Sequence, residues 1–293
     1  MSDGLNDAPR LGKVQCLGAG GLHRVAYWEW GDPRNDRVLV CVHGLTRQGR
    51  DFDTLARSLC DVYRVVCPDV AGRGESDRLA DAAAYQLPAY VADMVTLLAR
   101  VEARTLHWVG TSMGGLIGMG LAALPSSPIE RLVLNDVGPA LDAAGIARIG
   151  SYVGLPLSWA SEDEAADYLL TISAGFGPHS RDQWLALTRP MLRPDGDRLR
   201  LHYDPAIGVA LRAITPQAAA AGQAALWAAY DAIRCPTLVL RGEHSDVLAQ
   251  DTAEAMRQRG PRAEVHEIAG VGHAPTLVAA DQVAAVREFL TRP

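Results

Sequence analysis

Short apolar runs alternate with amphipathic stretches along most of this 293-residue sequence. The apolar runs are the length of strands and are rich in β-branched residues, whereas the stretches between them repeat apolar residues every three or four positions, as helices with one buried face do. Such a chain buries both kinds of element as a mostly parallel sheet with helices on both faces. The expected strands are residues 23–30, 38–43, 64–68, 106–110, 131–135, 237–241 and 263–268, and the expected helices are residues 51–59, 87–100, 113–124, 251–259 and 281–290.

The alternation stops between residues 139 and 223, where no convincing strand is found. Helical fragments such as residues 162–171 and 183–188 lie there among Ala, Gly and Pro. A structureless loop of this length is uncommon in a compact domain, so a mainly helical insertion is expected. We therefore expect one α/β core, residues 1–138 and 224–293, that carries a helical cap, residues 139–223.

Composition excludes several classes of partner. Hydrophobic residues make up 48% of the chain and charged residues 21%, which is ordinary globular usage. The net charge is -6 and the basic residues are scattered, which argues against nucleic acid and anionic membranes. No apolar stretch is long enough to cross a bilayer, and the start of the chain lacks the apolar core of a signal peptide. A cytoplasmic monomer or homodimer that acts on a small molecule is expected, and its five cysteines are expected to be mostly buried thiols.

The pentapeptide G-T-S-M-G at residues 110–114 is the strongest chemical signal. It follows the apolar residues 106–109 and precedes a run, residues 116–124, that is compatible with a helix. G-x-S-x-G in this strand-turn-helix setting forms a sharp turn that exposes the serine as a nucleophile. Side chains at positions 110 and 114 would collide with the backbone of such a turn, which explains glycine at both. Ser112 is the predicted nucleophile.

Two backbone amides are predicted to stabilise an oxyanion beside Ser112. The Met113 amide begins the helix that follows the serine, so it points at the reaction centre together with the positive end of the helix dipole. The Leu45 amide follows His43-Gly44 at the end of an earlier strand and is the second candidate. His43 is expected to organise this loop by hydrogen bonds; a role as catalytic base is the less favoured alternative.

His273 is the predicted base for Ser112, because a serine hydroxyl needs a group that accepts its proton. It stands in a glycine-containing loop directly after the last expected strand. The acid that orients it is assigned to Asp246, which follows the strand of residues 237–241. Glu243 in the same loop and Asp136 at the end of residues 131–135 remain rival candidates.

Several of these motifs occur together in the order known from one family. His43-Gly44, the segment D-V-A-G-R-G-E-S at residues 69–76, the elbow at residues 110–114, Asp246 and His273 resemble those of the α/β-hydrolase superfamily. The likeness runs from about residue 25 to residue 290 and is weakest in the insertion. It implies an eight-stranded, mostly parallel sheet, a helical cap after the sixth strand, no cofactor and no metal. It also implies a Ser112-Asp246-His273 triad beneath the cap, with the Leu45 and Met113 amides as oxyanion donors.

These residues predict a serine hydrolase that cleaves a small carboxylic ester through an acyl-enzyme. A lactone, enol-lactone or carbon-carbon bond hydrolase on the same triad is the main alternative, since the elbow does not distinguish the scissile bond. A ligand receptor on a hydrolase scaffold is a less favoured one. Ser112 argues against the dehalogenases and epoxide hydrolases of this superfamily, which carry aspartate at the elbow. An arginine of the insertion is a candidate for binding a substrate carboxylate.

Overall fold

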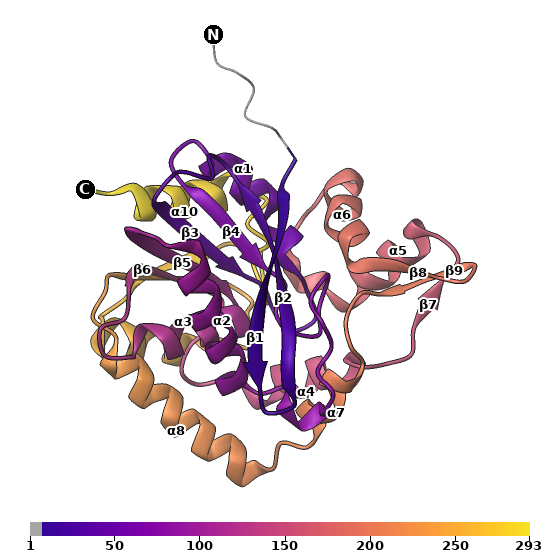
Figure 1. Ribbon diagram of the computed structural model, residues 1–293. Coiled ribbons are helices and arrows are strands. Elements are labelled where there is room, and N and C mark those ends of the chain that lie inside the picture. Colours follow the sequence, from indigo (N-terminus) through magenta and orange to yellow (C-terminus); the bar gives the residue numbers. More distant parts are fainter. Residues whose placement is uncertain (1–7) are drawn as a thin grey trace.

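The computed structural model describes residues 8–293 and is built around one eight-stranded sheet (Figure 1). The strands lie in the order β1-β2-β4-β3-β5-β6-β10-β11. β1 pairs antiparallel with β2, and β2 pairs antiparallel with β4, while the other neighbours are parallel. The mostly parallel sheet is therefore confirmed. The strands are β1 Arg10–Gly18, β2 Gly21–Trp30, β3 Arg37–Val42, β4 Arg64–Pro68, β5 Thr105–Thr111, β6 Ile129–Asn135, β10 Thr237–Gly242 and β11 Glu264–Ile268.

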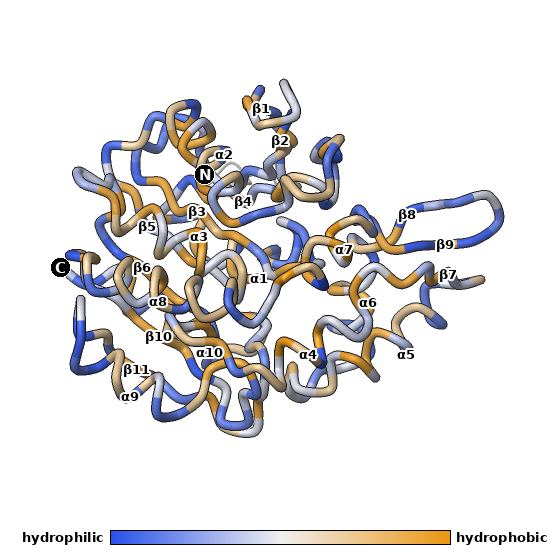
Figure 2. Tube along the Cα trace, turned by 90° about the horizontal axis from the view of Figure 1, so that it is seen from below, coloured by the Kyte–Doolittle hydropathy of each residue, from blue (hydrophilic) through white to orange (hydrophobic). Residues whose placement is uncertain are grey.

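Alternate side chains of the central strands enter two separate hydrophobic cores. Val38, Val40 and Val42 of β3 face one core, whereas Leu39 and Cys41 face the other. Burial of each such aliphatic side chain contributes about 1.5–3 kcal/mol. Figure 2 shows hydrophobic residues along these central strands, in the interior of the molecule. α1 (Asp53–Leu59) and α10 (Ala280–Thr291) cover one face of the sheet, and α2 (Leu87–Val101), α3 (Met113–Ala122), α8 (Pro216–Ala232) and α9 (Gln250–Gln258) cover the other.

The segment between β6 and β10 carries helices and a second, small sheet. The expectation that it holds no strand is wrong, because β7, β9 and β8 form a three-stranded antiparallel sheet there. Three of its helices begin at a capping side chain, Asp142, Ser161 or Ser180. The Ser180 hydroxyl accepts the Gln183 amide, and the Gln183 side chain accepts the Ser180 amide. α8 runs through residue 223, the predicted end of the cap. The elements are α4 Ala143–Tyr152, β7 Ser158–Trp159, α5 Glu162–Ile172, α6 Arg181–Thr188, β8 Leu192–Asp195, β9 Arg198–Leu201 and α7 Ala206–Arg212, and the short 3₁₀ helices of the chain are η1 Gly49–Phe52, η2 Ala82–Ala84, η3 Ala174–Phe176 and η4 Arg189–Met191.

Two further expectations concern burial and membranes. Cys16, Cys41 and Cys67 are buried thiols, as the sequence suggested. Within residues 8–293, none of the helices combines the length and the apolar character that a bilayer crossing requires.

α3 lies unusually close to the ends of β3 and β5. A Cβ atom on Gly114 would stand 2.0 Å from the carbonyl oxygen of Val42, and one on Gly110 would stand 2.3 Å from the backbone of Gly114. Both distances are far below van der Waals contact, and both obstacles are backbone atoms that cannot rotate away. Glycine at these two positions is therefore what allows the helix to start directly after the strand.

We expect Gly114→Ala to lower the midpoint of thermal unfolding sharply or to prevent folding, because the new methyl group must displace β3. Gly222→Ala in α8 is the matched control, since a Cβ there meets no atom within 4 Å. That substitution should be neutral or stabilising by up to about 1 kcal/mol, because alanine is the better helix former. Circular dichroism melts of both variants provide the measurement, and equal melting of the two would contradict the packing argument.

Candidate active site

Ser112 occupies the sharp turn between β5 and α3. Its backbone angles are φ 50° and ψ -115°, in a region that residues with side chains rarely adopt. The turn is held by the Ser112 amide, which donates to the carbonyl oxygen of Asn135 at 3.0 Å, and by the Ser112 carbonyl, which accepts the Gly115 and Leu116 amides. The strained serine is thus fixed between β5, β6 and α3, with its hydroxyl turned outward.

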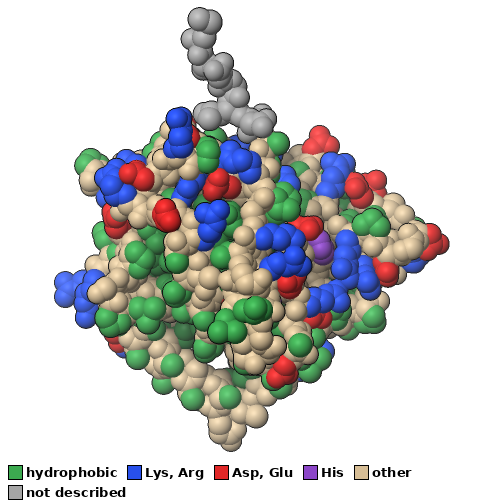
Figure 3. Space-filling view, in the orientation of Figure 1, with side chains coloured by type: hydrophobic (Ala, Val, Ile, Leu, Met, Phe, Trp, Pro, Cys, Tyr) green, Lys and Arg blue, Asp and Glu red, His purple; other side chains and the backbone are tan. Residues whose placement is uncertain are grey.

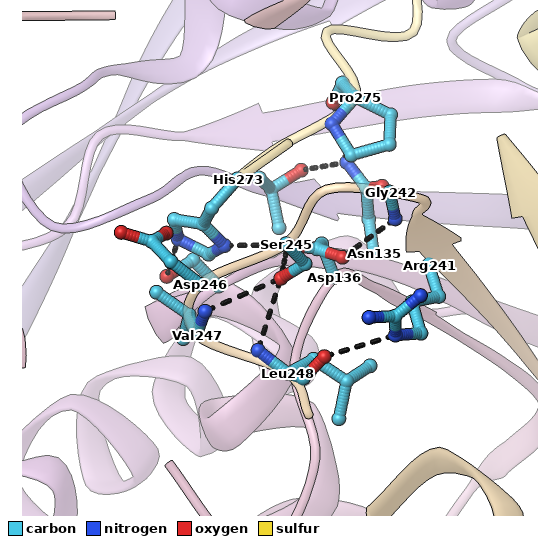
Figure 4. Close-up of polar contacts among 12 residues, drawn as sticks. Asn135, Asp136, Arg241, Gly242, Ser245, Asp246, Val247, Leu248, His273 and Pro275 are labelled. Atoms are coloured by element: carbon cyan, nitrogen blue, oxygen red, sulfur yellow. Dashed lines mark hydrogen bonds and ion pairs between the residues drawn. The ribbon is translucent and has the colours of Figure 1, made fainter. Parts of the chain in front are cut away.

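The hydroxyl of Ser112 meets His273. The distance from Ser112 Oγ to His273 Nε2 is 3.0 Å, and the other ring nitrogen, Nδ1, lies 2.7 Å from Oδ2 of Asp136. Figure 4 shows His273 beside Asp136, with the loop of residues 242–248 close to both. The predicted pairing of Ser112 with His273 is therefore present, and its third member comes from the end of β6.

Asp136 is fully buried and its carboxylate is saturated with hydrogen bonds. Oδ2 accepts the Ser245 hydroxyl at 2.6 Å as well as the imidazole, and Oδ1 accepts the Gly242 amide at 2.8 Å. The backbone of Asp136 has φ 54°, and its amide donates to the carbonyl of Leu240. Donors that converge on one carboxylate fix its direction, which is what an acid behind a catalytic histidine requires.

The expectation that Asp246 orients His273 is corrected by this geometry. The carboxylate of Asp246 instead accepts two hydrogen bonds from the Arg148 guanidinium of α4, at 2.5 Å and 2.8 Å. Hydrogen bonding to Arg148 holds the pKa of Asp246 below its usual value. The carboxylate in the β10 loop is thus paired with a guanidinium of the insertion. The rival candidate, Asp136, accepts the hydrogen bond from the imidazole of His273. Glu243 points elsewhere, because its side chain accepts the Gly270 amide.

The loop that carries His273 is attached to both the core and the insertion. The Asn135 side chain donates to the Pro275 carbonyl at 2.8 Å and to the Thr111 hydroxyl at 3.0 Å. On the other side of the histidine, the Gly272 amide donates to the carbonyl of Gly175 in η3. Neither Asn135 nor Ser245 is predicted from the sequence to be functional, although each neighbours a candidate acid.

The amides of Leu45 and Met113 remain the predicted oxyanion donors. Gly44 packs against Ser112, since a Cβ on Gly44 would stand 3.8 Å from the Ser112 Cβ. Within residues 8–293, neither the Leu45 amide nor the Met113 amide donates to an acceptor of the protein. Met113 is the first residue of α3, where helical amides lack an intrahelical acceptor. Two uncommitted donors beside a nucleophile are suited to an oxyanion.

His43 is a structural residue of the oxyanion loop. The Val70 amide donates to its Nε2 at 3.0 Å, so Nδ1 carries the hydrogen and donates to the Gly44 carbonyl at 2.7 Å. Complete burial is the main cause that lowers the pKa of His43 to about 3. The ring is therefore neutral at physiological pH and ties the Gly44 turn to the end of β4, as expected, rather than accepting a proton from Ser112.

Arg73 is a second buried support of this loop that sequence reasoning missed. Its side chain is 0% exposed, and its Nε donates to the Leu45 carbonyl at 2.8 Å. The same guanidinium donates to the Ala71 carbonyl and the Tyr90 hydroxyl and contacts Sδ of Met113 at 3.5 Å. No carboxylate within residues 8–293 forms an ion pair with it. A fixed positive charge therefore lies against both residues whose amides would hold an oxyanion.

Comparison with known proteins agrees with this geometry. A sequence profile described as the alpha/beta hydrolase family matches residues 39–286, which contain Ser112, Asp136 and His273. The chain belongs to the α/β hydrolase family. The predicted fold class and the prediction of a hydrolase are thereby confirmed.

Three relatives show how far the similarity of this α/β hydrolase extends. It is 55% identical to the 3-hydroxybutyrate-oligomer hydrolase of Cupriavidus necator, over 98% of this chain and 99% of that one. It is 26% identical to the esterase YbfF of Escherichia coli, over 82% of this chain and 87% of the relative. The crystal structure of an α/β hydrolase from Novosphingobium aromaticivorans superposes with a TM-score of 0.84 and 35% identity, covering 97% of this chain and 99% of that one.

Asp136→Asn should lower kcat by about 10³–10⁴-fold if Asp136 orients His273, because a neutral amide favours the wrong imidazole tautomer. Asp246→Asn is the matched control and should stay within about tenfold of the wild type, because the hydrogen bonds of Asp246 go to Arg148 and its charge acts on His273 only through space. Steady-state kinetics on a p-nitrophenyl ester would measure both. A larger loss in Asp246→Asn than in Asp136→Asn would restore Asp246 as the acid.

The free energy of unfolding should fall as the pH drops below about 6.5. The unfolded chain protonates His43 near its ordinary pKa of 6.5, whereas the folded chain resists until about pH 3, so this stability is complete above pH 6.5 and is lost toward pH 3. The slope that one such group contributes approaches about 1.4 kcal/mol per pH unit. Urea unfolding of the wild type and of His43→Asn at pH 7.5, 6.0 and 5.0 is the measurement. The variant should show the shallower slope, and parallel curves would assign the acid sensitivity to another group.

Proposed function

We propose that this hydrolase is a serine esterase that cleaves short oligomers of 3-hydroxybutyrate, or closely related hydroxyacid esters, through an acyl-enzyme. The hydrogen-bonded series Ser112, His273 and Asp136 carries the proposal of serine catalysis. The 55% identity with a 3-hydroxybutyrate-oligomer hydrolase over nearly the whole of both chains supports the substrate class. A cytoplasmic location, a monomeric or dimeric state, and function without metal or cofactor remain predictions.

The first half of the reaction forms the acyl-enzyme. Ser112 Oγ attacks the ester carbonyl while its proton passes to Nε2 of His273, which lies 3.0 Å away. The imidazolium that forms is stabilised by the Asp136 carboxylate at Nδ1. Amides of Leu45 and Met113 would bind the oxyanion of the tetrahedral intermediate. His273 then returns the proton to the departing oxygen, so the leaving group departs as a neutral hydroxyl, which in an oligomer is the hydroxyl end of the next unit.

The second half repeats these steps with water. A water molecule takes the place of the leaving group, gives its proton to His273 Nε2 and attacks the acyl carbonyl. Collapse of the second tetrahedral intermediate releases the carboxylate product, and the proton on His273 returns to Ser112. Each of the two steps uses the same donors and the same base, so one geometry serves both.

The Arg148-Asp246 ion pair supports a role for the insertion in limiting substrate access to His273. Gly145 lets α4 pack directly against the β10 loop, because a Cβ on Gly145 would stand 2.1 Å from the Asp246 carbonyl oxygen. Both charged side chains are about two-fifths exposed, at 39% and 40%. We therefore propose that α4 rests on the loop beside the catalytic histidine and restricts the acyl group to small chains.

Ser112→Ala should lower kcat for a 3-hydroxybutyrate trimer by about 10⁴-fold or more, because loss of a triad nucleophile removes the covalent route. Release of 3-hydroxybutyrate, followed by chromatography, is the measurement, and circular dichroism should show an unchanged fold. A chain-length series of p-nitrophenyl esters serves as the reference, with turnover expected to peak at short acyl groups.

Three outcomes separate the parts of this proposal. Full activity of Ser112→Ala would refute serine catalysis. Serine-dependent cleavage of p-nitrophenyl esters without cleavage of the trimer would keep the mechanism and refute the substrate class. Turnover of a lactone or of a carbon-carbon substrate, but of neither ester, would favour the alternative hydrolases on the same triad.

A further inference from the structure

A small pocket lies where the insertion meets the core, away from the residues used in catalysis. The loop after β4 forms one wall, and the β8–β9 hairpin with the residues after it forms the other. The walls are fastened by backbone hydrogen bonds: the Gly74 amide donates to the His202 carbonyl at 2.9 Å, and the Asp204 amide donates to the Gly72 carbonyl at 2.7 Å. The pocket has a volume of about 190 Å³ and is lined by Gly72, Gly74, Glu75, Ser76, Arg78, Arg193, His202 and Tyr203.

The side chains around this pocket are crowded with positive charge. Figure 3 shows Lys and Arg side chains gathered around a histidine on the face where the hairpin joins the core, and Figure 2 shows the hairpin itself as hydrophilic. Arg78 and Arg193 line the pocket, and Arg200 of β9 lies near enough for its charge to act on Arg193. Burial, and then the charges of Arg78 and Arg200, lower the pKa of Arg193.

Arg78 is exposed and Arg193 and Arg200 are partly buried, and few acceptors of the described residues reach their guanidinium groups. Within residues 8–293, the side chains of Arg78 and Arg193 form no ion pair and no hydrogen bond, and the imidazole of His202 has no hydrogen-bond partner. The Nε atoms of Arg193 and Arg200 are buried without an acceptor. A buried charged donor left unsatisfied costs free energy. Two guanidinium donors of the hairpin, the Nε atoms of Arg193 and Arg200, therefore lack an acceptor among the described residues.

Acidic groups nearby offset only part of this charge. Arg200 contacts Asp195 at 3.4 Å, and Glu75 lines the pocket without reaching within 4 Å of an arginine nitrogen. The Ser76 hydroxyl is already used, because it donates to the Asp69 carbonyl and accepts the Ala26 amide. The donors that remain for a ligand are thus the guanidinium groups and the imidazole. Guanidinium groups match the planar or tetrahedral oxygens of carboxylates and phosphates.

We propose that this pocket binds a small oxyanion, a carboxylate or phosphate group, between Arg78 and Arg193, with His202 as a further donor. Its volume is ample, since a single water molecule needs only about 10–15 Å³. A bound anion would join the β8–β9 hairpin to the loop of residues 72–76. That loop also carries Arg73, which supports Leu45. The proposal concerns binding and stands whether or not the proposed esterase activity is correct.

Isothermal titration with inorganic phosphate, and separately with 3-hydroxybutyrate and with acetate, tests the proposal. Sodium chloride at equal ionic strength corrects for general screening. The wild type should bind phosphate or a carboxylate at one saturable site, and the affinity should fall tenfold or more in Arg193→Gln and in Arg78→Gln. Arg198→Gln is the matched control: Arg198 lies on the same hairpin, but it donates to Ser158 and does not line the pocket. Its affinity should be unchanged.

Thermal unfolding gives a second, independent result. In anion-free buffer, Arg193→Gln should melt at a temperature equal to or higher than that of the wild type, since it removes a crowded cation; added anion should raise the melting temperature of the wild type alone. Phosphate binding without carboxylate binding would identify the ligand as a phosphate group, and the reverse would identify a carboxylate. Absence of saturable binding to the wild type, or equal binding to all four proteins, would overturn the proposal.

Discussion

The close approach of α3 to the carboxyl ends of β3 and β5 is the contact on which the site depends. Because Gly110 and Gly114 present no side chains, the helix can begin at the residue after Ser112 and the serine is forced into a conformation with φ 50°. The same approach makes Met113 the first residue of the helix and brings the Gly44 turn against Ser112. One steric constraint therefore fixes the positions of the nucleophile and of both candidate oxyanion donors. The acid and the base then have to reach the Ser112 hydroxyl.

The core of the fold could be predicted because its strands are buried on both faces, which leaves apolar runs that differ plainly from the amphipathic helices. β1 escaped prediction for the opposite reason. It lies at the edge of the sheet, and of its nine residues only Cys16 is buried, so no apolar pattern marks it. β7, β8 and β9 are two to four residues long, which is too short for a period of two to stand out.

Ser112 and His273 could be predicted from local sequence because each sits in a turn that demands glycine nearby. The acid could not, because β6 and β10 are adjacent parallel strands in which Asn135 pairs with Leu240. Aspartates that follow either strand can reach the same imidazole. Which aspartate contacts His273 depends on Arg148, which belongs to the insertion about a hundred residues before Asp246. Arg148 forms an ion pair with the Asp246 carboxylate. Arg73 was missed for a related reason, since nothing in a Gly-Arg-Gly sequence shows that its side chain is buried against Leu45.

The position of the acid has a consequence for how this enzyme can diversify. In the proposed mechanism Asp136 at the end of β6 orients the histidine, and the carboxylate of Asp246 is left to hold α4 of the insertion against the core. The groups of the β10 loop that hold Asp136 are the Gly242 amide and the Ser245 hydroxyl. Under that mechanism, substitutions at Arg148 and Asp246 can change how firmly the insertion is attached to the core while the hydrogen bonds among Ser112, His273 and Asp136 stay in place.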